Sequence, residues 1–207
     1  MGEQVFAFKQ FSVDHENAAF KVGTDACLLG CWVNISKVQS VLDIGTGSGV
    51  ISLIIAQRCN AVIEAIDIDK SSALQAKRNF EKSPWKERLV SHNQSLQQYE
   101  DKNQSRFDLI ICNPPFFRGS TPRSNLRSHV ARHETDLTFM NLLDAAKKLT
   151  SENGRLAFVL PLNRWNENKE LANTLGWFER RKLEIKPTES KKANRVLVEL
   201  SQKPQKY

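Results

Sequence analysis

Short apolar runs alternate with longer stretches of helical periodicity from residue 41 to the end of the chain. The apolar runs of strand length are 41–44, 61–67, 88–92, 107–112 and 154–161. In the stretches between them, apolar residues recur every three or four positions, as in a helix that buries one face. The helices expected on this basis are 49–58, 71–82, 136–149 and 167–176, the last ending at Gly176. Two final strands, 182–187 and 195–200, flank a polar segment and predict a hairpin.

This alternation predicts an α/β fold, a doubly wound and mostly parallel seven-stranded sheet with helices on both faces. The closing hairpin must add one antiparallel strand. No linker or internal repeat interrupts the pattern, so residues 1–207 are expected to form a single domain. Before the first strand, "GTDACLLGCWV" at 23–33 predicts a helix whose N-terminus is capped by Thr24.

Composition and charge narrow the classes of function. The chain has 207 residues, of which 40% are apolar and 26% charged, which suits a globular domain and excludes a disordered chain. No apolar run approaches the ~20 residues of a membrane-spanning helix. The first residues do not read as a secretory signal, so a cytoplasmic location is expected. The formal net charge of +7 favours acidic partners, nucleic acid first.

The four cysteines do not predict a metal site. Cys27 and Cys31 share one helix face, and so do His129 and His133. Structural zinc sites use tighter spacings between the two ligand pairs than the roughly hundred residues that separate these pairs. We therefore expect no metal, and we interpret the cysteines as small buried thiols.

A glycine-rich turn follows the first expected strand. "VLDIGTGSGV" places Asp43, Gly45, Gly47 and Gly49 at the carboxyl end of that strand, where open α/β sheets bind ligands and glycines let the backbone approach them closely. The dinucleotide fingerprint is incomplete, because Val50 stands where a third small residue is required. The Asp43 carboxylate suits a cationic amine better than a pyrophosphate. S-adenosylmethionine carries such an amine and no phosphate, so we expect this cofactor.

A second acid supports the nucleoside part of that cofactor. Asp67 ends the second strand, where its carboxylate could accept hydrogen bonds from both ribose hydroxyls. Ile68 would then lie against the adenine ring. The alternative is that Asp67 only caps the next helix. On the cofactor interpretation, residues 1–40 supply a lid and a helix, 41–161 the cofactor-binding core, and 162–207 the closing helix and hairpin.

The fourth strand runs into "CNPPFF" at 112–117, an amide followed by two prolines and two aromatic rings. The Asn113 carboxamide oxygen and the Pro114 carbonyl could accept both hydrogens of a planar exocyclic amine and direct its lone pair at the methyl group. Proline stiffens the turn, so the acceptors are held in advance. Phe116 would stack on the planar substrate. The alternative is a turn without chemistry.

Basic residues surround this predicted substrate pocket. No acid lies between residues 119 and 133, and four arginines occupy the stretch that follows the prolines; they are Arg118, Arg123, Arg127 and Arg132. They could bind the phosphates of a nucleotide taken out of its stack, or they could belong to a solvated loop without a role in binding. A second basic set lies on the closing hairpin, namely Arg180, Arg181, Lys182, Lys186, Lys191, Lys192 and Arg195. This set could be a surface that binds RNA, or it could protect the edge strand from pairing with another chain. Both interpretations stay open.

Taken together, these motifs resemble the class I methyltransferases that modify amino groups of adenine, guanine or glutamine and carry an Asn-Pro-Pro-aromatic motif. More narrowly, the chain resembles the bacterial tRNA1(Val) (adenine-37-N6)-methyltransferases over nearly its whole length. The segments that carry this resemblance are "FKQF" (8–11), "KVGTDACLLGCW" (21–32), "LDIGTGSG" (42–49), "SPWKERL" (83–89), "FDLIICNPPFF" (107–117), "AR" (131–132) and "VLP" (159–161).

The resemblance implies a tRNA substrate and S-adenosylmethionine as cofactor. It implies that Asn113, Pro114 and Phe116 bind the target adenine, and that Asp43, Gly45 and Asp67 hold the cofactor. Lys21 and Thr24 would border the methionine end of the cofactor; the alternative is a helix start with a solvated lysine. No feature of the sequence argues for more than a monomer, and no membrane partner is expected.

The chain departs from the family at Ser95, where the related enzymes carry an aspartate that accepts from the cofactor adenine. Ser95 could accept one bond, and Asn93 or Gln94 could serve instead.

Three other functions stay open. They are glutamine N5-methylation of a release factor, guanine N2-methylation of ribosomal RNA, and a non-catalytic RNA-binding module. Enzymes of the first kind usually carry a separate helical domain that forty N-terminal residues cannot supply.

Overall fold

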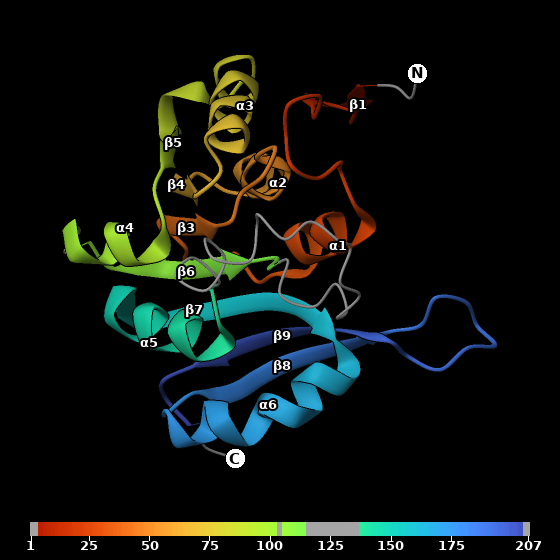
Figure 1. The fold of residues 1–207 in the computed structure, drawn as a ribbon, viewed down its shortest axis with the longest axis vertical. Coiled ribbons are helices and arrows are strands. Elements are labelled where there is room, and N and C mark those ends of the chain that lie inside the picture. The colour runs from red at the N-terminus through yellow and green to blue at the C-terminus, as the bar shows by residue number, and fades with distance from the viewer. Residues whose placement is uncertain (1–3, 103–104, 115–136, 205–207) are drawn as a thin grey trace, which may run out of the picture.

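A computed structural model of the chain describes residues 4–102, 105–114 and 137–204 (Figure 1). Their central feature is a seven-stranded sheet with the strand order β5-β4-β3-β6-β7-β9-β8. The strands are β3 (Ser40–Ile44), β4 (Val62–Asp67), β5 (Leu89–Asn93), β6 (Phe107–Cys112), β7 (Thr150–Pro161), β8 (Phe178–Ile185) and β9 (Arg195–Ser201). The pairs from β5 to β7 are parallel, whereas β9 runs antiparallel to both β7 and β8. The predicted sheet with one antiparallel strand is confirmed.

Helices cover both faces of this sheet (Figure 1). One face packs against α1 (Thr24–Trp32), α2 (Val50–Arg58) and α3 (Lys70–Glu81). The other packs against α4 (Leu96–Lys102), α5 (Phe139–Leu149) and α6 (Leu162–Thr174). Successive residues of β3 therefore enter different cores, Val41 the first and Leu42 the second. Among the described residues no helix is long and apolar enough to cross a membrane.

The sheet reverses its strand order at β3, which has β4 on one side and β6 on the other. Open α/β sheets bind ligands beside such a reversal, at the carboxyl ends of the strands. The register pairs Ile44 with Cys112, the last residues of β3 and β6. Gly45 and Asn113, which follow directly, therefore leave the sheet side by side.

The N-terminal segment forms a separate two-stranded sheet, β1 (Val5–Ala7) with β2 (Ser12–Asp14). Asn79 of α3 fastens this segment to the domain. Its Oδ1 accepts from the Asp14 N–H at 3.1 Å, and its Nδ2 donates to the Asp14 carbonyl at 2.7 Å and to the Ser48 carbonyl at 2.8 Å. The chain beyond β2 thus starts beside the glycine loop.

Several predicted helix ends differ from the observed ones. Gly23 is the N-cap of α1 and has an extended backbone, while Thr24 is already helical. The prediction that Thr24 caps this helix was therefore wrong. Gly49 is the N-cap of α2, which begins one residue later than predicted. A short 3-10 turn, η1 (Lys86–Arg88), precedes β5.

The C-terminal elements begin earlier than their patterns suggested. Helix α6 starts at Leu162 instead of 167, and β8 starts at Phe178 instead of 182. The interpretation of the cysteines as buried thiols holds for Cys112 only, because Cys31 is exposed and Cys27 and Cys59 are half-buried. His129 and His133 lie outside the described residues.

Candidate active site

Two neighbouring cavities open where β3 and β6 leave the sheet. The first, of about 400 Å³, lies between the glycine loop, the start of α1 and the end of β7. The second, of about 790 Å³, lies between the glycine loop, the end of β4, α4 and α6. Residues shared by the two walls are Phe20, Gly45, Gly47 and Asn113. The glycine loop and the start of the Asn-Pro-Pro segment therefore border one continuous site.

The glycine loop offers a bare backbone to both cavities. Gly45 and Gly47 have φ angles of +70° and +58°, which L side chains rarely adopt. A Cβ added to either would meet nothing within 4 Å, so the space above the loop is open to a ligand. Gly49 differs, because its added Cβ would approach the Phe80 ring to 2.5 Å. Gly45 and Gly47 thus leave room for a ligand, whereas Gly49 allows the loop to pack against Phe80.

Asp67 joins the end of β4 to the glycine loop and lines the second cavity. Its Oδ2 accepts from the Gly47 N–H at 2.8 Å and its Oδ1 from the Asp69 N–H at 2.9 Å. Each carboxylate oxygen keeps a second acceptor position, so the group can still bind two hydroxyls. Burial raises the pKa of this carboxyl. Ile68 is exposed on the same cavity wall, as the predicted adenine contact requires.

Asp43 lies beneath the glycine loop and lines neither cavity, which differs from the open contact with a cationic ligand expected from the sequence. Its Oδ2 accepts from the hydroxyls of Thr46 at 2.8 Å and Ser52 at 2.7 Å. Its Oδ1 is buried and has no hydrogen-bond partner among the described residues. Burial raises the pKa of Asp43 to about 6. Contact with a ligand amine stays a prediction, and Oδ1 is the atom left to make it.

Asn113 and Pro114 lie where the two cavities meet. Asn113 lines both cavities and Pro114 lines the first. Within the described part of the chain, the Asn113 carboxamide forms no hydrogen bond, so its oxygen is available to a substrate. Phe116 and the arginines at 118, 123, 127 and 132 lie outside the described residues, and their roles stay predictions.

The residues after β5 decide how an adenine ring could be held. The Ser95 hydroxyl accepts from the Gln98 N–H at 3.2 Å, while the Gln98 side chain accepts from the Ser95 N–H at 3.0 Å. This is a capping box at the start of α4. Asn93 donates its amide to the Asp67 carbonyl at 3.0 Å and lines neither cavity. Gln94 and Ser95 both line the second cavity, so these two remain as acceptors for the adenine.

The predicted residues of the N-terminal segment lie at the first cavity, where Lys21 and Thr24 form part of the wall. Sequence reasoning missed Phe20, an exposed ring that lines both cavities. It also missed Arg164 and Asn168, which reach the second cavity from α6. The helix was predicted to begin at 167, so no pattern assigned Arg164 to it.

The fold and the site define a class I methyltransferase. The chain matches the model of the methyltransferase small domain over residues 20–182. It is 44% identical to a tRNA1(Val) (adenine(37)-N6)-methyltransferase of Trichodesmium erythraeum, covering 98% of this chain and 86% of that one. A relative of the same name from Parabacteroides distasonis is 37% identical over 99% and 86% of the two chains. The protein belongs to the tRNA1(Val) (adenine(37)-N6)-methyltransferase family, as the sequence motifs indicated.

A solved structure agrees at the level of the fold. The ribosomal protein L11 methylase from Lactobacillus delbrueckii subsp. bulgaricus superposes with a TM-score of 0.67 at 15% identity. The match covers 96% of this chain and 98% of that one. At this identity the likeness supports the class I methyltransferase fold and nothing about the substrate.

Proposed function

We propose that the protein methylates the exocyclic N6 amino group of adenine 37 in valine tRNA, with S-adenosylmethionine as methyl donor. The relatives that share 37–44% of its residues carry this activity in their names. The observation that supports a methyl transfer most directly is that Asn113 lines both cavities together with the glycine loop. We expect the protein to act as a monomer in the cytoplasm.

The residues present fit the cofactor. The open space over Gly45 and Gly47 accommodates a ligand pressed against the backbone. Asp67 can accept from two ribose hydroxyls, and Ile68 offers an apolar surface to a ring. Lys21 and Thr24 border the cavity in which the methionine end would lie. When bound, the cofactor would supply an electrophilic methyl group carried on a positively charged sulfonium sulfur, which would leave as a neutral thioether.

Asn113 and Pro114 would bind the amine of the substrate and orient its lone pair for methyl transfer. The lone pair of an adenine N6 is delocalised into the ring, so the amine is a weak nucleophile. The two N–H groups of the amine would donate hydrogen bonds to the Asn113 oxygen and the Pro114 carbonyl. These hydrogen bonds would orient the lone pair toward the methyl group. Neither residue has to be a strong base, because the methylated amine can lose its proton to water.

The test is to incubate the protein with labelled methyl donor and total tRNA and to identify the modified nucleoside. We expect labelled N6-methyladenosine at position 37 of valine tRNA. The variant Asn113→Ala should lower kcat about 100-fold or more, the usual effect of removing one such electrostatic contact, and leave the cofactor Kd nearly unchanged. Asp67→Ala should instead act mainly on cofactor binding. We expect calorimetry to show a clearly weaker cofactor Kd for this variant.

Two results would contradict the proposal. Label in a guanosine would indicate an N2-methyltransferase of guanine, and label in protein without label in RNA would indicate a glutamine methyltransferase. Near-normal turnover of Asn113→Ala would contradict the role of this residue even where the nucleoside is correct.

A further inference from the structure

The connection between β8 and β9 extends away from the body of the protein (Figure 1). Strand β8 forms the edge of the sheet, and the last paired residues of the hairpin are Ile185 and Arg195. Residues 186–194 follow without further strand pairing. Residues 178–195 carry seven basic and three acidic side chains, so the whole hairpin is positively charged.

The lysines of this connection have no counter-charge among the described residues. Lys186, Lys191 and Lys192 are all exposed, and no carboxylate within the described ranges pairs with any of them. On the neighbouring strand, by contrast, Lys182 pairs with Glu184 at 3.2 Å. Unpaired exposed lysines on a projecting loop form a site for anions.

Edge protection does not explain these three lysines. Lysine protects an edge strand when it lies among the unpaired backbone groups of that strand. Arg180, Arg181 and Lys182 are in that position on β8. Lys186, Lys191 and Lys192 lie beyond the last pair of the ladder, where there is no edge to protect.

Arg195 connects this charged loop to the active site. It is the first residue of β9 and lines the first cavity together with Asn113 and Pro114. Its Nε donates to the Asp25 carboxylate at 3.1 Å, and its Nη1 donates to the Asn194 carbonyl at 3.2 Å. Asp25 thus orients the guanidinium. No hydrogen bond to the described residues uses Nη2, so the arginine can still bind a further acceptor.

We propose that the β8–β9 hairpin is an arm that binds the phosphate backbone of the RNA next to the target nucleotide. This inference rests on the proposed function and adds to it the surface that holds the substrate. Arg195, oriented by Asp25, takes a phosphate at the mouth of the first cavity, and Lys186, Lys191 and Lys192 take phosphates farther along the strand. Lys192 is three residues from Arg195, so their Cα atoms lie within about 11 Å. One RNA strand can reach both.

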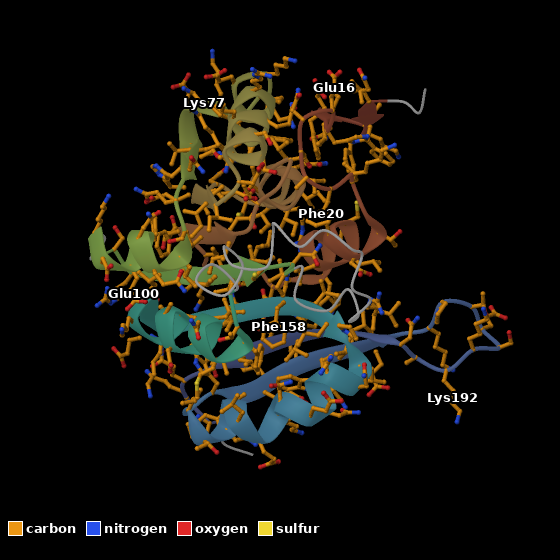
Figure 2. All side chains as sticks on the ribbon, in the orientation of Figure 1. Glu16, Phe20, Lys77, Glu100, Phe158 and Lys192 are labelled. Atoms are coloured by element: carbon orange, nitrogen blue, oxygen red, sulfur yellow. The ribbon has the colours of Figure 1, made fainter. Side chains whose placement is uncertain are left out.

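The first experiment compares two variants that remove the same charge. The arm variant is Lys186→Ala, Lys191→Ala and Lys192→Ala. The control is Lys77→Ala, Lys82→Ala and Lys86→Ala, three exposed lysines of α3 and the turn after it. Figure 2 shows Lys77 and Lys192 at distant parts of the molecule. The Kd for unmodified tRNA is measured over a range of salt concentrations, and the Kd for cofactor is measured alongside.

We expect the arm variant to bind tRNA at least about tenfold more weakly at low salt, with a slope of log K against log salt reduced by about 2–3. The slope follows from a loss of about 0.7–0.9 for each phosphate contact. The control variant should keep the slope and affinity of the wild type, and cofactor binding should be the same in all three. An arm variant that binds tRNA like the control would overturn the inference.

The second experiment tests the orientation of Arg195. Asp25→Asn keeps the size of the side chain and removes the charge that holds the guanidinium. We expect the KM for tRNA to rise several-fold while the cofactor Kd stays constant. A weaker cofactor Kd with an unchanged KM for tRNA would instead assign Arg195 and Asp25 to the cofactor and remove them from the arm.

These results are separable from the proposed function. Binding of tRNA is measured without methylation, so the arm is supported if its variant loses affinity even where the methylated nucleoside proves to be a different one. Equally, labelled N6-methyladenosine from the wild type supports the function even where the arm variant binds normally.

Discussion

Asp43 combines three properties at the scale of a single residue. It is fully buried, its Oδ2 accepts two hydroxyl bonds, and its Oδ1 has no partner among the residues that the structure describes. Hydrogen bonds from Ser52 and Thr46 lower its pKa, but burial outweighs them and raises the pKa to about 6. A carboxyl of this kind stabilises the loop above it at the cost of a strongly unfavourable environment for its own charge.

We expect Asp43→Asn to flatten the pH dependence of the free energy of unfolding between about pH 4 and pH 6. The unfolded chain ionises this carboxyl near its ordinary pKa of 3.8, whereas the folded chain ionises it near 6. Raising the pH through this window therefore destabilises the wild-type fold, by an amount on the order of 3 kcal/mol. Asparagine has no charge to bury, so the variant lacks this loss.

Urea unfolding at several pH values measures this effect. Asp69→Asn is the control, because hydrogen bonds, first from Ser71, lower the pKa of Asp69. Asp69 therefore adds stability as the pH rises and loses it on acidification, the opposite sign. Parallel pH profiles for wild type and Asp43→Asn would contradict the prediction.

At the scale of elements, α3 holds the N-terminal segment through buried polar side chains. Ser72, Gln75 and Asn79 lie on one face of the helix and are buried. Their partners are backbone groups and side chains of the segment that follows β1. This segment continues to Phe20 and Lys21, so a helix far from the chemistry positions part of the cavity wall.

We expect Asn79→Ala to weaken cofactor binding several-fold without unfolding the domain. The substitution leaves the Asp14 N–H and the carbonyls of Asp14 and Ser48 without their partner, at a cost of about 1–3 kcal/mol. Limited proteolysis should cut the N-terminal segment faster, and calorimetry should show the weaker cofactor Kd. Arg78→Ala, an exposed neighbour on the same helix, should behave like the wild type; equal proteolysis of both variants would count against this role of Asn79.

Strands β3 and β6 were predictable, because their residues are mostly apolar and almost all buried, and β4 was predictable from its buried apolar positions. Strands β1 and β2 have three residues each, too few for a pattern. The pattern of 71–82 predicted a helix, but only the fold shows what its buried polar residues bind. In the site, Gly45 and Asn113 directly follow strands and Asp67 is the last residue of one, so their placement could be predicted. Phe20, Arg164 and Arg195 reach the cavities from distant elements, which no local pattern encodes.

At the scale of the whole molecule, a buried ion pair joins the C-terminal hairpin to the rest of the sheet. Arg155 on β7 donates to Glu199 on β9 at 3.2 Å, and the Glu199 side chain is about 1% exposed. Its other oxygen accepts from the Asn34 N–H, after α1, at 3.4 Å. Glu199 thus connects β7, β9 and the loop after α1 at one point.

We expect Glu199→Ala to destabilise the protein by about 3–5 kcal/mol, because Arg155 would be left as an unpaired buried charge. Urea unfolding measures the loss. Glu184→Ala removes a carboxylate from an exposed pair in the same hairpin and should cost less than about 1 kcal/mol. Equal stability of the two variants would show that Arg155 finds another partner or water.

Arg195 is anchored by neighbours on both sides, pairing with Pro161 of β7 and with Ile185 of β8. The backbone position of Arg195 is therefore fixed by its pairing with strands on both sides and does not depend on the nine-residue connection at 186–194. Surface connections tolerate insertion and deletion at little thermodynamic cost. The connection could consequently change in length without moving Arg195 away from the first cavity.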